Sequence, residues 1–501
     1  MLPFLRLLFS ALLAAAIMFS VVNLSESDDY LTQRINILNS DNTLFAGGKL
    51  NLSDKELVVN ELILKEKKAE LTEAHQNVSN FLPSRHFFQA RPDIEKSNVF
   101  SIIKKLPKGA SLHTHLTAAV SADFMIENIT YKENIYGCFI NGIFKLRFLG
   151  NADDDKTCDW KELKKYREED PNFDQWLKKQ MSLEVDNPLD VYPSIDVIWQ
   201  RFKKIFSTAY DMVCYKPVFK EYIYQLLKEL YEDNVMYTEL RGTFMPLYDL
   251  NGTVYDTKEF FNVFIETVEE FKQDHPRFLG ARYIHSIYRG VTPEVLKSGL
   301  DELITLKKLY PQFIAGFDFV GYEEEGRPIV EFHKVLLEAS EELKFFFHAG
   351  ETNWYGSTDL NLIDAVLLNS SRIGHAFALS RHPILMHLVK AKDIAIELCP
   401  ISNQVLMLNE DPRTHPAISL LAKDFPVVIS NDDPSAWGAS GLSYDWYVAF
   451  LAMTPVDVGI EVLKKFAMDS IRYSAMNDDE KDTALEKWSL DWQIFLEDML
   501  K

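Results

Sequence analysis

Histidine and carboxylate residues recur in this sequence directly after short apolar runs. His348 ends the run Phe345–Phe347, and Glu351 follows it after a glycine. An imidazole and a carboxylate that close a buried strand lie where parallel α/β folds place their reactive groups. Taken alone, the pair is equally compatible with a core histidine and a solvent-facing glutamate. The chemistry becomes specific only if other strand ends contribute similar groups.

Three further runs end in groups of this kind. His113 and His115 lie two residues apart, so on a strand both side chains point the same way, into a barrel. His375 ends another run, and Asp432 and Asp433 end the last one. Imidazole and acidic groups crowded together without a cation carry a large desolvation cost. Three nitrogens and one oxygen suit Zn²⁺ with a position open for water, so the expected ligands are His113, His115, His348 and Asp432.

Such a site predicts hydrolysis by a water that the metal activates. Glu351 and His375 then remain available for proton transfer, and Asp433 for the substrate.

The elements that must position these residues alternate along the chain. Apolar runs separated by helical patterns, such as Pro293–Leu309, Ile329–Leu343 and Leu360–Leu368, indicate a parallel sheet. Eight runs predict an α/β fold of the (β/α)8 TIM-barrel type. The expected strands are Ala110–His115, Val235–Leu240, Phe278–His285, Phe313–Phe319, Lys344–His348, Ser371–His375, Asp393–Cys399 and Pro426–Ser430.

The barrel is expected to occupy residues 101–501, with additions. The gap between its first two strands is too long for one crossover helix, which predicts an inserted subdomain at about residues 126–193. Cys138 and Cys158 lie in this polar segment and would pair in an oxidising compartment. Cys214 and Cys399 have apolar surroundings typical of buried free thiols. Trp199–Tyr231 is expected to form the helical return.

A helical segment is expected at residues 23–100. Ser53-Asp54-Lys55-Glu56 is a capping-box pattern that starts a helix. Leu57, Leu64 and Leu71 follow at heptad spacing, which fits either packing on the chain's own core or a partner helix in a homodimer. At the other end of the chain, residues 478–501 predict an amphipathic helix.

Charge and the N-terminus indicate the compartment. The net charge of -21, from 53 Lys+Arg and 74 Asp+Glu, argues against binding to nucleic acid or anionic membranes. Arg6 followed by the apolar run Leu7–Ile17 predicts a cleaved signal peptide over residues 1–22 and no stable membrane insertion. Six glycosylation sequons, at Asn23, Asn51, Asn77, Asn128, Asn251 and Asn369, also favour a secreted protein.

The motifs together resemble a known family. L-P-K-G-A-S-L-H-T-H, G-F-D-F-V-G-Y-E, F-F-F-H-A-G-E-T, R-I-G-H-A-F-A-L-S, C-P-I-S-N-Q-V-L and V-I-S-N-D-D-P are similar to the adenosine deaminase family. The resemblance is greatest to its secreted branch, the adenosine deaminase-related growth factors. It covers nearly all of the mature chain, including the helical segment and the inserted subdomain.

The resemblance implies one zinc per chain on the four ligands above and conversion of adenosine to inosine and ammonia. Glu351 would donate a proton to purine N1, and His375 would orient the attacking water and take its proton. Asp433 and the backbone at Gly321 would hydrogen-bond the purine, and Trp199 would line the nucleoside pocket. A cell-surface receptor would be a further partner of this branch.

The sequence departs from the family around the sugar. Where relatives commonly carry an aspartate after the second histidine of H-x-H, this chain has Leu116 and Thr117. Tyr288 stands in place of a histidine of secreted relatives, and Ala376, in place of a glycine, is a smaller change beside His375. Leu116 and Thr117 predict a high KM for adenosine and weak discrimination between ribo- and deoxyribonucleosides, unless Glu184 or Trp199 already holds the ribose.

Two other functions fit parts of the sequence. A binuclear amidohydrolase shares the H-x-H motif but requires a bridging lysine after the fourth strand, where this chain reads Phe317-Asp318-Phe319-Val320-Gly321. A secreted growth factor or receptor ligand could retain the barrel without catalysis, but none of the expected ligands or proton-transfer residues is replaced.

Overall fold

Eight parallel strands form the centre of the molecule. The computed structural model describes residues 29–501, so the predicted signal peptide and Asn23 lie outside the described residues. The strands form two four-stranded sheets, ordered β1-β5-β6-β7 and β8-β9-β10-β11. Their bounds are β1 Gly109–His115, β5 Val235–Gly242, β6 Gly280–Tyr288, β7 Ile314–Val320, β8 His348–Ala349, β9 Arg372–His375, β10 Ala395–Leu398 and β11 Val427–Ile429.

Two parallel bridges close these sheets into a barrel. Thr114 of β1 pairs with Asp432, which follows β11, and Phe317 of β7 pairs with Phe345, which precedes β8. Each predicted strand therefore exists, in the predicted order, and the (β/α)8 barrel is confirmed. The carboxyl ends of all eight strands meet at one mouth, which is why residues far apart in sequence can form one site.

The phenylalanine run before β8 pairs on both sides although the regular strand is short. Phe346 N donates to Phe317 O at 3.0 Å, and Ser371 N donates to Phe345 O at 2.8 Å. All three rings are buried, as expected of a strand inside the barrel wall. This pairing fixes the position of His348 at the mouth.

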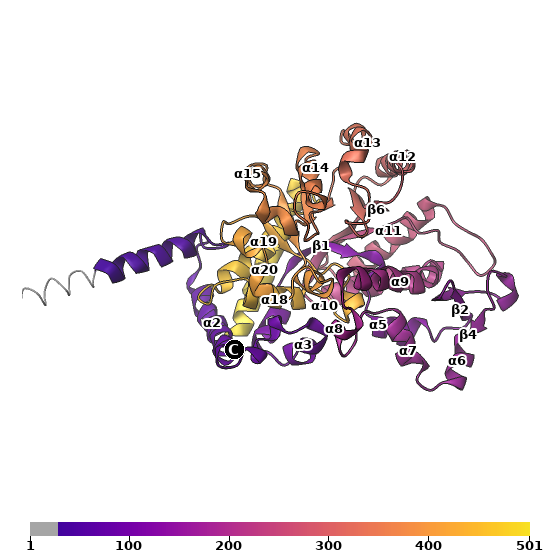
Figure 1. Ribbon diagram of the computed structural model, residues 1–501, viewed down its shortest axis with the longest axis horizontal. Helices are drawn as coiled ribbons and strands as arrows, with labels where there is room; N and C mark the ends of the chain where they lie inside the picture. Colours follow the sequence, from indigo (N-terminus) through magenta and orange to yellow (C-terminus); the bar gives the residue numbers. More distant parts are fainter. Residues whose placement is uncertain (1–28) are drawn as a thin grey trace, which may run out of the picture.

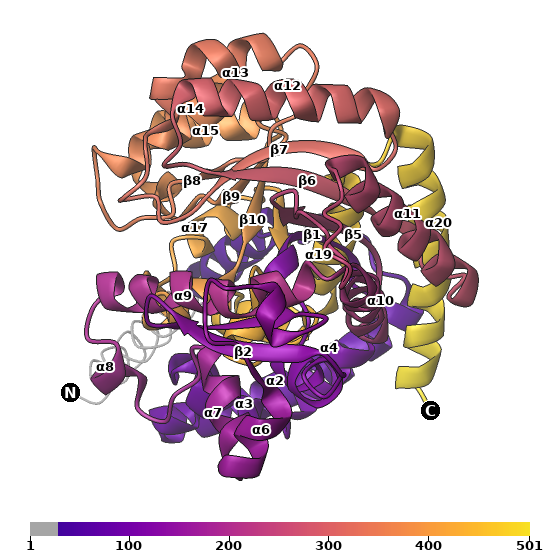
Figure 2. The same ribbon diagram turned by 90° about the vertical axis from the view of Figure 1, so that its right-hand side faces the viewer.

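Helices surround the barrel, as Figure 2 shows. Helix α12 has the predicted bounds, whereas the pattern at Ile329–Leu343 forms a helical turn and a shorter helix, α13. The return predicted at Trp199–Tyr231 is two helices, α9 and α10. The outer helices are α9 Ile195–Val213, α10 Lys216–Glu232, α11 Thr257–Asp274, α12 Pro293–Leu309, α13 His333–Ala339, α14 Asn361–Leu367, α15 Pro383–Ala391, α16 Pro400–Val405, α17 Ile418–Leu421, α18 Ser443–Ala452, α19 Ile460–Arg472 and α20 Asp478–Met499.

The N-terminal segment adds α2 Asp54–Gln76, α3 Phe87–Ile94 and α4 Asn98–Lys105, preceded by a helix at residues 29–44 that projects from the body in Figure 1. The capping box at Ser53 and Glu56 is present. Val59, Ile63, Lys67 and Ala74 form the buried face of α2. Leu57 is instead 50% exposed, so the heptad leucines do not form the main contact of α2 with its own core.

The inserted region lies at the opposite end of the molecule from the helix at residues 29–44 (Figure 1). It contains a three-stranded sheet, ordered β3-β2-β4, and small helices. A disulfide joins Cys138 and Cys158, while Cys214 and Cys399 are free and buried, as the sequence predicts. The elements are α5 Ala122–Phe124, β2 Ile135–Ile140, β3 Ile143–Phe148, β4 Lys161–Glu162, α6 Leu163–Glu169, α7 Phe173–Gln180 and α8 Pro188–Val191.

The C-terminal helix α20 packs its aromatic side against the rest of the fold. Trp488, Trp492 and Phe495 are buried, and Trp488 Nε1 donates to Pro107 O at 2.9 Å. Across residues 29–501, every helix is too short or too polar to cross a bilayer.

Candidate metal and catalytic site

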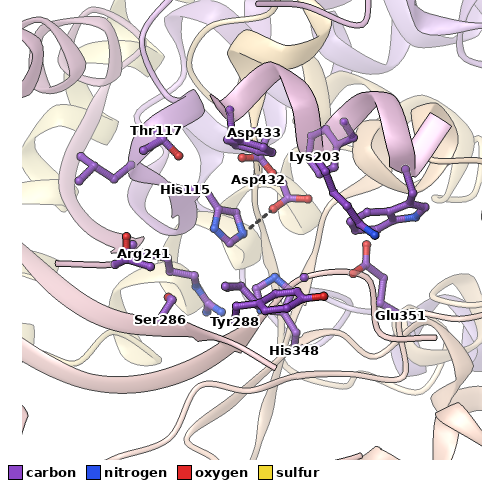
Figure 3. A pocket seen from close by; sticks show the side chains of 18 of the residues that line it. His115, Thr117, Lys203, Arg241, Ser286, Tyr288, His348, Glu351, Asp432 and Asp433 are labelled. Carbon is purple, nitrogen blue, oxygen red and sulfur yellow. Dashed lines mark ion pairs between the residues drawn. The ribbon is translucent and has the colours of Figure 1, made fainter. Parts of the chain in front are cut away.

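A cavity of about 320 Å³ opens at the carboxyl ends of the strands. Figure 3 shows His115, His348, Glu351, Asp432 and Asp433 around this space. Its remaining walls are largely apolar and include aromatic side chains of α9. The lining residues are His115, Leu116, Thr117, Trp199, Phe202, Lys203, Phe206, Tyr210, Arg241, Gly242, Thr243, Ser286, Tyr288, Val320, Gly321, His348, Glu351, His375, Leu406, Asp432 and Asp433.

The four expected metal ligands lie together beneath this cavity. Asp432 Oδ1 is 3.2 Å from His113 Nε2 and 3.1 Å from His115 Nε2. Together with His348, each of these residues offers one ligand atom, and the four atoms lie within 4.8 Å of one another. His113 and His115 come from β1, His348 from β8, and Asp432 from the turn after β11. The structure thus brings the predicted ligand set together.

Two buried carboxylates hold the imidazoles from behind. His113 Nδ1 is 2.7 Å from Glu397 Oε2, and His348 Nδ1 is 2.7 Å from Asp318 Oδ2. Such contacts direct the Nε2 atoms at the metal position and are common around metal-bound histidines. Burial opposes ionisation of Asp318, but His348 and Arg241 hold its pKa well below the usual range. The Asp318 carboxylate can therefore accept a hydrogen bond from the Nδ1–H group of His348.

The sequence analysis did not identify these supporting residues. The signal that could have found them is a charged residue inside a buried strand, as with Glu397 in I-E-L and Asp318 in F-D-F. Arg241 of β5 donates to both Asp318 and Glu397. Arg372 of β9 in turn donates to Glu397 and Glu239, each at 2.6 Å.

Backbone conformation aims two of the site residues. His375 and Asp432 have φ values of 57° and 59°, in the left-handed region that non-glycine residues seldom adopt. Ala376, next to His375, also has a positive φ of 43°, which explains why a glycine would suit this position. Residues in this region of φ are strained, so they persist only where the surrounding fold holds them in place. They are found most often at functional sites.

The surroundings of Glu351 oppose its ionisation. Burial and the neighbouring charge of Asp432 raise the pKa of Glu351 well above its usual value. Its backbone N–H donates to Glu323 Oε2 at 2.7 Å, which holds the turn after β8. The raised pKa favours the protonated form of this carboxyl group, which lines the cavity.

Asp433 and Asp432 behave oppositely although they are adjacent. Burial and the charge of Asp432 raise the pKa of Asp433 well above its usual value, which favours its protonated form. Burial also opposes the ionisation of Asp432, but the adjacent imidazoles of His113 and His115 lower its pKa well below the usual range. One carboxylate is therefore available to a cation and one carboxyl group to a substrate.

His375 completes the group from the end of β9. Its Nε2 lies 3.6 Å from Glu351 Oε1 and 3.7 Å from Asp432 Oδ2. Burial lowers the pKa of His375 well below 6.5, so the ring is neutral. It lies beside the four-residue ligand set and remains free to contact a substrate or a water molecule.

A second, overlapping set of possible ligands includes a thiol. Cys399 lies close enough to His113, His375 and Asp432 to form an alternative four-residue group. Burial and nearby carboxylates raise the pKa of Cys399 well above its usual value. A protonated thiol is a poor metal ligand, so the three-histidine set is favoured.

Gly321, Tyr288 and Trp199 lie where a bound ring would fit. Gly321 has a φ of 105°, and a Cβ there would lie 2.7 Å from the ring of Tyr288, so only glycine suits this contact. Tyr288 is 48% exposed at the mouth. Trp199 stacks on Tyr322, with ring centroids 4.8 Å apart and planes 14° apart.

The two residues in place of the family aspartate differ in accessibility. Both line the cavity, but Leu116 belongs to the core and is 1% exposed, whereas Thr117 is half-buried. Glu184 is outside the cavity lining, and its carboxylate pairs with Arg91 at 2.8 Å. Thr117 is therefore the more accessible of the two positions.

A barrel of parallel strands with a histidine–aspartate cluster at its mouth defines a class of metal-dependent hydrolases. Family models agree: one described as adenosine deaminase matches residues 179–489, and one described as adenosine/AMP deaminase N-terminal matches residues 11–103. The chain belongs to the adenosine deaminase family, and it is a hydrolytic deaminase. The resemblance drawn from the sequence motifs is confirmed.

Full-length relatives support this assignment. Adenosine deaminase 2 of Sus scrofa is 40% identical over 503 residues, which cover 98% of each chain. An adenosine deaminase of Phlebotomus duboscqi is 39% identical over 500 residues, 97% of each chain. A solved cog1816 amidohydrolase from Burkhoderia ambifaria, with bound Zn, has a TM-score of 0.56 at 18% identity, over 80% of this chain and 94% of that chain. At this identity the solved structure shows the shared fold.

Proposed function

We propose that this protein is a secreted, zinc-dependent deaminase that converts adenosine and 2′-deoxyadenosine to the inosine nucleosides and ammonia. One observation carries the proposal: a protonated carboxyl group, a neutral imidazole and a cluster of metal-ligating atoms face the same cavity. The names of the full-length relatives supply the substrate.

The residues of the cluster fit a zinc ion. Within the described part of the chain, His113 Nε2 and Asp432 Oδ1 are buried without a hydrogen-bond partner. Unsatisfied buried polar atoms are costly, and a cation held by His113, His115, His348 and Asp432 would satisfy them. When bound, zinc would supply a water made nucleophilic near neutral pH.

The remaining side chains have separate roles in this proposal. Glu351 donates its proton to purine N1, which makes C6 more electrophilic. His375 contacts the water that attacks C6. Asp433 and the backbone at Gly321 hydrogen-bond the purine, while Trp199 and Tyr288 flank the nucleoside. Each role requires only the protonation state that burial imposes on that group.

Secretion rests on the predicted signal peptide, the disulfide and the sequons. Asn51, Asn77, Asn128, Asn251 and Asn369 are all exposed, as glycan attachment requires. A disulfide between Cys138 and Cys158 is stable in an oxidising compartment.

A homodimer is also proposed, through the projecting helix at residues 29–44. Leu31, Ile35 and Leu38 share one face of this helix and are 51%, 53% and 44% exposed. An apolar face without intramolecular cover fits a second copy of the chain better than solvent. Glutamate at these three positions should convert a dimer to a monomer in analytical ultracentrifugation, whereas a wild-type monomer would contradict the proposal.

Ammonia release from adenosine by the purified protein tests the main proposal. We expect one zinc per chain by elemental analysis, loss of activity after chelation, and recovery with one equivalent of zinc. Two equivalents of metal, or an active preparation without metal, would refute the single-zinc site. No ammonia release from the zinc-loaded protein would refute the substrate assignment.

A further inference from the structure

We propose that Asn403 and His415 are positioning residues that hold His375 in one tautomer, with the ring proton on Nε2 facing the reaction centre. The inference rests on the proposed contact between His375 and the attacking water. It concerns a chain of three hydrogen bonds behind His375, on the side away from the cavity.

The direction of this chain is set by a backbone amide. Ala417 N donates to His415 Nδ1 at 3.1 Å, and a backbone N–H can only donate. A neutral imidazole that accepts at Nδ1 carries its proton on Nε2. His415 Nε2 lies 3.0 Å from Asn403 Oδ1, so His415 is the donor of this second bond.

The third bond transfers this polarity to His375. Because Asn403 Oδ1 accepts from His415, the amide nitrogen of Asn403 faces the other way and lies 3.1 Å from His375 Nδ1. An amide N–H donates, so His375 Nδ1 accepts and the ring proton lies on Nε2. That Nε2 points towards Glu351 Oε1 and Asp432 Oδ2, both of which can accept a hydrogen bond.

Burial keeps the His415 ring neutral, and the amide N–H of Asn403 requires His375 Nδ1 to accept. His415 is 3% exposed and His375 is 2% exposed. Desolvation lowers the pKa of His415 to about 3. The His415 ring therefore does not act as a double donor near neutral pH.

The residues that form this series of hydrogen bonds are held firmly in place. Asn403, in α16, donates its backbone N–H to Cys399 O at 3.0 Å and accepts two backbone N–H groups at its carbonyl oxygen. His415 lies between Pro412 and Pro416 and packs edge-on against Phe377, with ring centroids 5.0 Å apart. A fixed backbone leaves the amide and the rings little freedom to reverse the hydrogen bonds.

The consequence concerns what His375 does in the reaction. A ring with its proton on Nε2 contacts the attacking water as a donor to the water oxygen. It has no lone pair on Nε2 with which to take the water's proton. Of the two roles that the family resemblance implies for His375, the structure supports orienting the water and opposes accepting its proton.

Nitrogen NMR of protein labelled with ¹⁵N-histidine tests the tautomer directly. The signals of His375 are identified by their loss in His375→Ala. We expect a protonated Nε2 and an unprotonated Nδ1 in the wild type. In Asn403→Asp the carboxylate accepts from both rings, so the proton of His375 should move to Nδ1. A proton on Nδ1 in the wild type would overturn the proposal, whatever the activity of the protein.

Kinetics separate positioning from a purely structural role. A correctly placed donor to a reacting oxygen contributes about 10²–10³-fold to kcat. Asn403→Asp and His415→Phe should lose about this much in kcat, with KM and zinc content unchanged. His415→Gln keeps an N–H donor towards Asn403 and should retain kcat within about threefold. A wild-type kcat in Asn403→Asp, or equal losses in both His415 variants, would contradict the proposal. An inactive wild-type protein would refute the proposed function instead.

Discussion

Asp432 and Asp433 are neighbours in the chain, yet their surroundings move their pKa values in opposite directions. The adjacent imidazoles of His113 and His115 lower the pKa of Asp432, while burial beside that charge raises the pKa of Asp433. Burial beside the charge of Asp432 raises the pKa of Glu351 in the same way. Carboxyl groups whose environments separate their pKa values mark the residues that take different roles in acid–base chemistry.

At the residue scale, Glu351→Gln should lower kcat strongly while the protein still binds zinc. Glutamine has the same shape but no transferable proton, and general acid catalysis contributes about 10²–10⁴-fold. We expect a loss of at least about 100-fold, measured as initial rates of ammonia release. Glu324→Gln is the matched control, because Glu324 lies outside the cavity lining and accepts from Trp354 Nε1. A turnover near that of the wild type in Glu351→Gln would show that Glu351 is not the proton donor.

Sugar recognition is the second prediction at this scale. The Thr117 hydroxyl offers only a neutral hydrogen bond, whereas a carboxylate on a sugar hydroxyl contributes about 1.5–3 kcal/mol. Thr117→Asp should therefore lower the KM for adenosine about tenfold or more. Leu116→Asp should instead destabilise the fold, since Leu116 is 1% exposed and the new charge would be buried. An unchanged KM in Thr117→Asp would show that the missing aspartate does not limit binding.

At the element scale, a buried charge network ties the strands together. Arg372 of β9 bridges Glu397 of β10 and Glu239 of β5, and all three side chains are fully buried. Arg372→Met would leave two buried carboxylates without this partner, which costs about 3–5 kcal/mol. Arg327→Met is the control, because the pair of Arg327 with Glu331 is exposed and contributes about 0–1 kcal/mol. Equal midpoints of the two variants in urea unfolding would contradict the role assigned to the network.

At the scale of the whole molecule, buried neutral histidines should make stability fall in mild acid. Desolvation lowers the pKa of His285 to about 3, and its ring stacks on Phe244 at 3.7 Å. Between pH 6.5 and 3 the unfolded chain binds a proton at this residue and the folded chain does not, so stability falls as pH decreases. At pH 5 this amounts to about 2 kcal/mol for His285.

Thermal unfolding at pH 7 and pH 5 measures this effect. His285→Phe should reduce the loss of Tm between the two pH values, because the replacement cannot bind a proton and keeps the contact with Phe244. Replacement of the exposed His387 by glutamine should leave the loss unchanged. If His285→Phe lost as much Tm between pH 7 and pH 5 as the wild type does, the effect could not be assigned to His285.

The sequence alone determined the barrel, its eight strands and the residues at its mouth. Strand periodicity and helix patterns are local properties, so they can be read without the fold. The sequence also predicted the disulfide and the capping box, both of which are confirmed. The ligand set followed because residues that end parallel strands must share one edge of the sheet.

Only the tertiary structure decided which groups support that site. Glu397, Asp318, Asn403 and His415 act through contacts with residues that are 284, 30, 28 and 12 positions away in sequence. Tertiary structure likewise showed that Leu116 is 1% exposed whereas Thr117 is half-buried, although the two are adjacent and both line the cavity. Burial and hydrogen-bond direction depend on every element packed around a side chain, and these set the pKa values and tautomers on which the chemistry depends.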